Sequence, residues 1–225
     1  MKKTSVLITT YHENRQKDIP SVIHAWLGQP IHELWLIDQS KDQKNLKIKD
    51  ERFTHWKMPI DCKTRSDYGL AHLTTGDYVC FADDDIYPRL TFASEMISWM
   101  EELSADFVGV IGRQFEKQNY NSGSHFFASS KITEPVRVDF CGVLYFVKRK
   151  FINFDPIGIV SPNIDDLYHA YQFPQAKKYV VPMKHYVNLP ECNKNSAMCK
   201  NKKLMTERNK FYNKIYQELK KERLK

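Results

Sequence analysis

The sequence predicts an α/β fold in which helices flank a mixed, mostly parallel central sheet, with a basic helix at the C-terminal end. Strand-like and helix-like apolar patterns alternate over residues 1–105, which is typical of a parallel sheet covered by helices. Strand-like segments dominate residues 106–190, so we expect the sheet to become mixed there. We therefore expect one domain of residues 1–190 in two halves, and a basic loop and helix at 191–225.

The chain is expected to begin with a buried strand at residues 4–10, a short β-branched segment that ends in a polar turn. Apolar residues at helical spacing then predict a helix at 19–27, which Gly28 closes. A second strand is expected at 33–38, and Asp38 begins a polar loop at its C-terminal end.

Four elements are expected in the remainder of the first half. They are a shorter strand at 53–58, a helix at 66–75, a strand at 77–82 and a helix at 89–103. Gly76 is expected to stop the first of these helices, and Pro88 to open the second.

The second half is predicted to hold more strands than helices. We expect a strand at 107–111, a strand signal over 136–147 that Gly142 interrupts, and a strand at 178–181. One short helix is expected from about residue 163 to 171.

The net charge of +7 and the isoelectric point near 9.0 arise in the C-terminal segment. From Lys194 onward eleven basic residues stand against three glutamates, so the remainder of the chain carries a net charge of −1. This balance argues against a nucleic-acid-binding protein, and we expect no nucleic acid partner.

The basic segment itself has three interpretations. It can be a solvated helix docked through one apolar side, a peripheral contact to an anionic membrane, or a segment that helps to hold a donor diphosphate. The expected apolar side consists of Leu204, Phe211, Ile215 and Leu219.

Composition indicates a cytoplasmic protein, or one peripheral to a membrane. The five cysteines are odd in number and contain no Cys-x-x-Cys pair, which favours a reducing compartment. The apolar segment 6–8 is too short for a signal peptide, and no stretch approaches the roughly 20 apolar residues that cross a bilayer.

Asp83, Asp84 and Asp85 are the strongest chemical signal, because they directly follow a predicted strand. Two such charges about 5 Å apart repel by roughly 3 kcal/mol at an effective dielectric near 20, so a cation is expected to offset them. Alternation places Asp83 and Asp85 on one side, where they can share Mg²⁺ or Mn²⁺. The alternative is a solvated acidic turn, or acids that cap the helix after Pro88.

Together with three other segments, these acids resemble the family 2 glycosyltransferases, which have the GT-A fold, a Rossmann-like α/β arrangement. The most specific segment runs from Arg65-Ser66-Asp67-Tyr68-Gly69-Leu70-Ala71 to Gly76-Asp77-Tyr78-Val79-Cys80-Phe81-Ala82-Asp83-Asp84-Asp85. The others are Val6-Leu7-Ile8-Thr9-Thr10-Tyr11, Leu36-Ile37-Asp38-Gln39-Ser40 and Asn163-Ile164-Asp165-Asp166-Leu167.

The resemblance implies a binding site for a nucleotide-sugar donor carrying UDP, GDP or dTDP. Thr9, Thr10 and Tyr11 match the turn that lines the nucleobase, and Asp38 the carboxylate that accepts a hydrogen bond from it. Arg65 matches a basic residue that reaches toward ribose or phosphate, although it is equally well a surface charge. Asp84 completes the donor-binding set. Gln39 stands where the family usually has a second acid and a glycine, which leaves the base undefined.

The resemblance also implies the groups for catalysis. Asp165 and Asp166 match the acidic pair that supplies the general base of inverting members; we slightly favour Asp166, and acids at a helix N-terminus are the alternative. His185 matches a third metal or diphosphate contact, with an ordinary exposed histidine as the equal alternative. Gly142 matches a segment bordering the donor sugar and acceptor, and a β-bulge would explain it equally well.

These observations predict a metal-dependent, inverting transfer of a sugar from a nucleotide to a hydroxyl of a glycan or glycolipid. A nucleotidyltransferase is the alternative enzyme, but it normally has a glycine-rich loop after the first strand. Residues 9–14 contain no glycine. The third hypothesis is a nucleic-acid-binding protein that uses the basic C-terminal segment.

Overall fold

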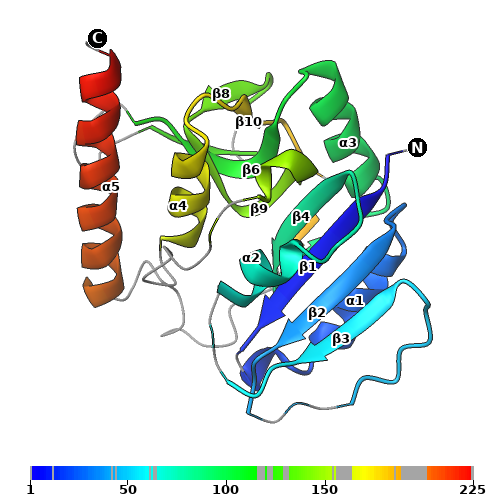
Figure 1. Ribbon diagram of the computed structural model, residues 1–225. Helices are drawn as coiled ribbons and strands as arrows, with labels where there is room; N and C mark the ends of the chain where they lie inside the picture. The colour runs from blue at the N-terminus through cyan, green and yellow to red at the C-terminus, as the bar shows by residue number, and fades with distance from the viewer. Residues whose placement is uncertain are drawn as a thin grey trace.

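The computed structural model places a nine-stranded sheet at the centre of the protein (Figure 1). It describes residues 2–11, 13–41, 43, 45–60, 62, 65–115, 120, 124–128, 132–153, 155, 164–184, 186–188 and 202–223. Within them the strand order is β3-β2-β1-β4-β9-β6-β10-β8, with β7 paired to β6. These strands are β1 (Thr4–Thr10), β2 (Glu33–Asp38), β3 (Phe53–Lys57), β4 (Tyr78–Asp83), β6 (Phe107–Arg113), β7 (His125–Phe127), β8 (Val136–Val138), β9 (Phe140–Lys148) and β10 (Lys178–Val180).

Strand directions make the sheet mixed but mostly parallel, as the sequence predicts. β1 lies parallel to both β2 and β4, β2 is parallel to β3, and β10 is parallel to β6. β9 runs antiparallel to both β4 and β6, so β4 and β6 share one direction. A separate pair of short antiparallel strands is formed by β5 (Ile86–Pro88) and β11 (Tyr186–Asn188).

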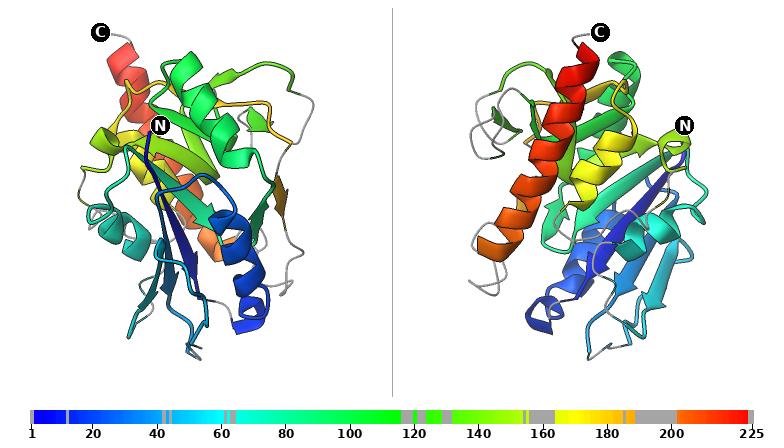
Figure 2. Two further views of the ribbon diagram at one scale, coloured as in Figure 1. Left: turned by 90° about the vertical axis from the view of Figure 1, so that its right-hand side faces the viewer. Right: turned by 60° about the vertical axis from the view of Figure 1, so that its left-hand side comes forward.

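Helices cover both faces of the sheet and bury a different side of each strand (Figures 1 and 2). On one face, α1 (Ile19–Leu27) and α3 (Phe92–Glu102) pack on a core that includes Val6 and Ile8. On the other, α2 (Arg65–Ala71) and α4 (Asp165–Gln172) pack on a core that includes Leu7. The alternation along β1 reflects the period of two in a strand. Short 3₁₀ turns, η1 (Glu13–Arg15) and η3 (Arg149–Phe151), connect elements.

The C-terminal helix α5 (Lys202–Arg223) lies beside α4 (Figure 2, right). Its buried side chains are Arg208, Tyr212 and Ile215, whereas Leu204 and Phe211 are only half-buried. The side chain of Leu219 lies outside the described residues. The buried stripe of α5 therefore includes an arginine, which the apolar pattern does not predict. None of the described helices is long and apolar enough to cross a bilayer.

Two predicted helices are longer than the real ones. α2 ends at Ala71 rather than at residue 75, because the Thr74 amide and hydroxyl both donate to the Ala71 carbonyl and end the helix with a turn. α3 begins at Phe92, because Pro88 belongs to β5 and pairs with β11. Leu90, which falls inside the predicted helix, lies before its actual start and is 80% exposed.

The interruption predicted at Gly142 falls elsewhere. Strand pairing breaks at Asp139, between β8 and β9, and Gly142 lies inside β9. The register between β6 and β9 shifts opposite Val143, which has a φ of 65°. A β-bulge is therefore present one residue after Gly142. Strands from both sides of the boundary between residues 105 and 106 belong to one sheet, and the division into two halves there stays a prediction.

Candidate active site

The carboxyl ends of three neighbouring strands bring four of the sequence-predicted residues together. Thr9 of β1 is opposite Asp83 of β4, and Thr10 is opposite Asp38 of β2. Ligands of open α/β sheets collect at this edge, beyond the carboxyl ends of the strands. The parallel register of β1, β2 and β4 therefore places these side chains at the edge where a ligand is expected.

Arg15, which no sequence motif singled out, is the counter-ion of the acidic segment. Its guanidinium contacts Asp84 through Nη1 and lies 3.0 Å from Asp85 Oδ2 through Nη2. The second oxygen of Asp84 accepts a hydrogen bond of 2.7 Å from Thr10 Oγ1. Burial opposes the charge of Arg15, but Asp84 and Asp85 raise its pKa above the usual value. The sequence does place a basic residue, Arg15, in the turn after the first strand, and this position could have indicated its role.

Asp83 ends β4 and is exposed to solvent, unlike Asp84. Protein atoms nevertheless surround its carboxyl group, and this burial, with the charges of Asp85, Asp84 and Asp165, raises the pKa of Asp83 well above its usual range. Because water reaches the side chain, we regard the neighbouring carboxylates as the more important cause. The edge therefore carries more negative charge than Arg15 offsets.

Tyr11 and Asp67 flank the acids and have shifted pKa values too. Burial and the charges of Asp83 and Asp84 raise the pKa of Tyr11 to about 12, so its hydroxyl remains a proton donor at neutral pH. Asp67 lies on α2 beside Thr9, and burial together with the charge of Asp165 raises its pKa well above the usual range. Asp67 belongs to the segment that carries the resemblance, in which the sequence pattern pointed only to Arg65.

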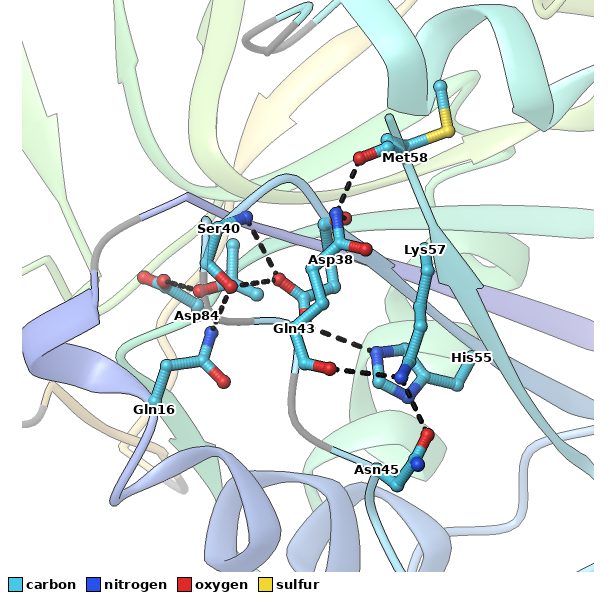
Figure 3. Close-up of polar contacts among 10 residues, drawn as sticks. Gln16, Asp38, Ser40, Gln43, Asn45, His55, Lys57, Met58 and Asp84 are labelled. Carbon is cyan, nitrogen blue, oxygen red and sulfur yellow. Dashed lines mark hydrogen bonds and ion pairs between the residues drawn. The ribbon is translucent and has the colours of Figure 1, made fainter. Parts of the chain in front are cut away.

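Asp38 is 1% exposed, and a polar network already uses its carboxylate (Figure 3). Oδ1 accepts hydrogen bonds from the backbone amide and hydroxyl of Ser40, at 3.0 and 2.6 Å, and Oδ2 lies 3.2 Å from His55 Nε2. Ser40 accepts in turn from Gln16 Nε2 at 3.1 Å. Burial raises the pKa of Asp38, but the bonds from His55 and Ser40 outweigh it and hold the pKa below normal.

A hydrogen bond connects the loop after β2 to α2, the helix that begins with Arg65. Gln39 donates to Ser66 Oγ at 2.8 Å and so ties the end of β2 to the start of α2. Arg65 is the first residue of α2 and is exposed. Its contact to a donor stays a prediction, as does that of Asp38 to a nucleobase.

Asp165 and Asp166 occupy the first turn of α4 and face different neighbours. Asp165 adds its charge to the burial that raises the pKa values of Asp67 and Asp83, so it lies toward the acidic edge. Asp166 Oδ2 instead lies 2.8 Å from Nη2 of Arg208, and its Oδ1 accepts from the Leu167 amide at 2.7 Å.

Gly142 gives Asp166 room against the backbone of β9. A Cβ atom at this position would lie 2.5 Å from Asp166 Oδ2, closer than any normal contact. The bulge at Val143 supports one interpretation of Gly142, and its place beside the donor sugar and acceptor stays a prediction.

Two solved glycosyltransferases have a similar arrangement of elements. S. aureus TarS 1-349 matches with a TM-score of 0.60 and 16% identity, over 82% of this chain and 59% of that one. GalNAc-T7 with UDP, GalNAc and Mn²⁺ matches with a TM-score of 0.61 and 11% identity, over 88% of this chain and 45% of that one. Both have the GT-A fold. This chain has the GT-A fold.

The likeness is one of fold. A second structure of TarS 1-349, in complex with UDP-GlcNAc, matches with a TM-score of 0.58 and 15% identity, over 82% of this chain and 57% of that one. The chain thus spans about half the length of the structures that it matches. No protein-family model and no curated protein matches the sequence.

The GT-A edge of this chain offers oxygen ligands but no complete metal cage. Among the described residues, no group of three or more His, Cys, Asp or Glu side chains could hold an ion. His185 lies outside the described residues. Asp83 and Asp85 are the two predicted metal ligands that the structure describes, and Asp85 forms an ion pair with Arg15, as Asp84 does. The excess negative charge around Asp83 and the hard carboxylate oxygens fit Mg²⁺ or Mn²⁺, if a ligand supplies the other oxygens.

Proposed function

We propose that the protein is a metal-dependent, inverting glycosyltransferase that moves a sugar from a nucleotide-sugar donor to a hydroxyl of a glycan or glycolipid. One observation carries the proposal: within a GT-A fold, exposed Asp83 and Asp165 of α4 lie near each other at the carboxyl edge of the sheet, and Asp166 follows Asp165 in the first turn of α4. The similar structures support it, because GalNAc-T7 was solved with UDP, GalNAc and Mn²⁺, and TarS 1-349 in complex with UDP-GlcNAc.

Donor binding would use the residues at the ends of β1, β2 and β4. Thr9, Thr10 and Tyr11 would line the nucleotide, with Asp38 fixing the loop beside the base and Asp84 anchored through Thr10. Arg65, at the exposed start of α2, would reach the ribose or a phosphate. UDP, GDP and dTDP remain the candidate carriers.

Asp83 and Asp85 would hold the divalent cation, Mn²⁺ or Mg²⁺. Bound there, the cation would offset the charge that develops on the departing nucleoside diphosphate. Arg15 touches Asp85, so it must yield part of this contact to the ion or stay beside it as a second positive charge. His185 would be a further contact on this side.

Asp166 would act as the general base, with Asp165 beside it toward the acids. Each carboxylate oxygen can accept two hydrogen bonds, so Asp166 can still accept from an acceptor hydroxyl while Arg208 and the Leu167 amide hold it. Asp166 would take the hydroxyl proton as that oxygen bonds to the anomeric carbon. The bond from this carbon to the diphosphate would break at the same time, with inversion.

We also propose a peripheral contact between the exposed face of α5 and an anionic membrane. The cytoplasmic leaflet carries such a negative charge, which agrees with a cytoplasmic location. Lys203 and Lys214 are exposed and lie on the side away from the buried stripe. Each lysine near an anionic surface contributes about 1 kcal/mol.

The proposal is tested by calorimetric titration of UDP-, GDP- and dTDP-sugars with and without Mn²⁺. We expect one nucleotide class to bind, more tightly with Mn²⁺, and the Mn²⁺ effect to disappear in Asp83→Asn and Asp85→Ala. Asp50→Asn is the matched control, because Asp50 lies at the surface beside Arg52. If no nucleotide binds the wild type, the function is wrong; if the Mn²⁺ effect survives both variants, the metal site is wrong.

A further inference from the structure

Arg208 is the most deeply placed basic residue described on α5. It is 3% exposed, whereas Lys202, Lys203 and Lys210 of the same helix are exposed. It shares the buried side of α5 with Tyr212, which packs against Leu167 and Ala170 of α4. Figure 2 (right) shows α5 running alongside α4, so Arg208 points into the interface between the two helices.

The guanidinium of Arg208 is fixed from several directions. Nη2 lies 2.8 Å from Asp166 Oδ2, and the central carbon lies 4.7 Å from the centre of the Tyr120 ring and 5.7 Å from that of Phe140. Aromatic faces attract a guanidinium in this arrangement, and its planar fork gives a carboxylate a defined direction. Tyr120 and Phe140 also stack on each other, so Arg208 lies against a pair of stacked aromatic rings.

A buried charge is costly unless it is paired, and apolar residues on this stripe would pack α5 at least as well. The arginine is therefore better explained by what it does to Asp166 than by stability. Oδ2 of Asp166 contacts Arg208, Oδ1 accepts from the Leu167 amide, and the missing side chain of Gly142 leaves room for Oδ2 close to β9. These contacts select one rotamer of the carboxylate.

We propose that Arg208 is a positioning residue that aims Asp166 at the acceptor hydroxyl, so that the C-terminal helix completes the active site. This inference rests on the proposed glycosyltransferase function. It gives the basic segment a role distinct from a solvated appendage, a membrane contact or a diphosphate clamp. Arg208 acts through Asp166 and not on the donor, so its loss should affect turnover and leave donor affinity nearly unchanged.

The test compares Arg208→Met, which removes the charge but keeps a long apolar side chain, with Arg208→Lys, which keeps the charge without the fork. Lys210→Met is the matched control on the exposed side of α5. We expect Arg208→Met to lower kcat about 100-fold, the size of effect that misplacing a catalytic group by about 1 Å produces. The donor Kd should stay within about threefold, Arg208→Lys should recover part of kcat, and Lys210→Met should match the wild type.

A double-mutant cycle with Asp166→Asn separates positioning from a merely structural role. If Arg208 acts through Asp166, adding Arg208→Met to Asp166→Asn should lower kcat no further. Circular dichroism and thermal unfolding confirm that each variant is folded before kcat is compared.

Three outcomes overturn the inference. They are an unchanged kcat in folded Arg208→Met, equal losses of kcat in Arg208→Met and Arg208→Lys, and a further 100-fold loss in the double variant. A wild type that transfers sugar from no nucleotide overturns the proposed function, and this inference with it. An active wild type with an indifferent Arg208→Met overturns the inference alone.

Discussion

The carboxyl edge of the sheet and the interface between α4 and α5 each hold aspartates beside an arginine, but water reaches them differently. At the edge, Arg15 and Asp85 keep 14% and 20% of their side-chain surface exposed, and Asp83 is exposed outright. At the interface, Asp166 keeps 14% of its side-chain surface exposed, but the Arg208 side chain is only 4% exposed and lies against aromatic rings. An ion pair whose arginine is open to solvent can exchange its counter-ion, whereas a pair whose arginine is packed against aromatic rings is held in place. We therefore expect the edge to exchange ligands and the interface to set geometry.

The largest expected effect is on the chemical step at the interface. Asp166→Asn keeps the size of the side chain but removes the group that accepts the proton, so kcat should fall about 10²- to 10⁴-fold. Single-turnover assays with saturating donor measure it. Asp165→Asn should cost less. The reverse order would assign the base to Asp165 and move the chemistry toward the wet edge.

Stability distinguishes the two arginines next. Arg208→Ala leaves Asp166 without its partner in a poorly hydrated interface and should lower the free energy of unfolding by about 3 kcal/mol. Urea denaturation measures this loss, with Lys210→Ala as the control on the same helix. A loss below about 1 kcal/mol is typical of an exposed ion pair. It would show that the pair of Arg208 and Asp166 is no less hydrated than the pairs of Arg15.

The buried histidine of α4, His169, predicts a dependence of stability on pH. His169 is fully buried between the Tyr145 hydroxyl, 2.9 Å from Nδ1, and the Phe151 carbonyl, 2.8 Å from Nε2. Burial lowers its pKa to about 3, from an unfolded value near 6.5. The unfolded chain thus binds a proton first, and stability should fall by up to about 1.4 kcal/mol per pH unit as pH drops from about 6.5 to 3.

His169→Gln tests this dependence by denaturant titration at several pH values. Carboxylates titrate in both proteins, so the difference between the two slopes isolates His169. The variant should lose less stability per pH unit between pH 6 and 4. Parallel slopes would show that water reaches His169 where α4 packs on the sheet.

The smallest expected effect is at the edge. Arg15→Ala should destabilise the protein by about 1–2 kcal/mol in EDTA, because Asp84 and Asp85 lose their counter-ion. Mn²⁺ should raise the melting temperature of this variant more than that of the wild type, since the arginine no longer competes for the acids. Arg89→Ala, at an exposed position, is the control. An equal Mn²⁺ shift in both proteins would mean that Arg15 and the ion do not share a site.

The elements that formed as predicted are those whose signal is local. The strands that begin at Thr4, Glu33 and Phe53 follow from β-branched and apolar segments that the sheet buries. One error arose where pairing with a distant segment overrode a local rule. A proline commonly begins a helix, but Pro88 lies in β5 and pairs with Tyr186 of β11.

The sequence by itself determined the parallel half of the sheet, the acids that follow β4 and the acidic pair of α4, because hydrophobic periodicity and strand ends are written in neighbouring residues. Only the tertiary structure decided which charges meet. Arg15 finds Asp84 across 69 positions, and Arg208 finds Asp166 across 42. Such pairs leave no periodic trace, since their partners are chosen by the packing of whole elements. For that reason Arg208, which the sequence assigns to a basic segment, is buried and pairs with Asp166.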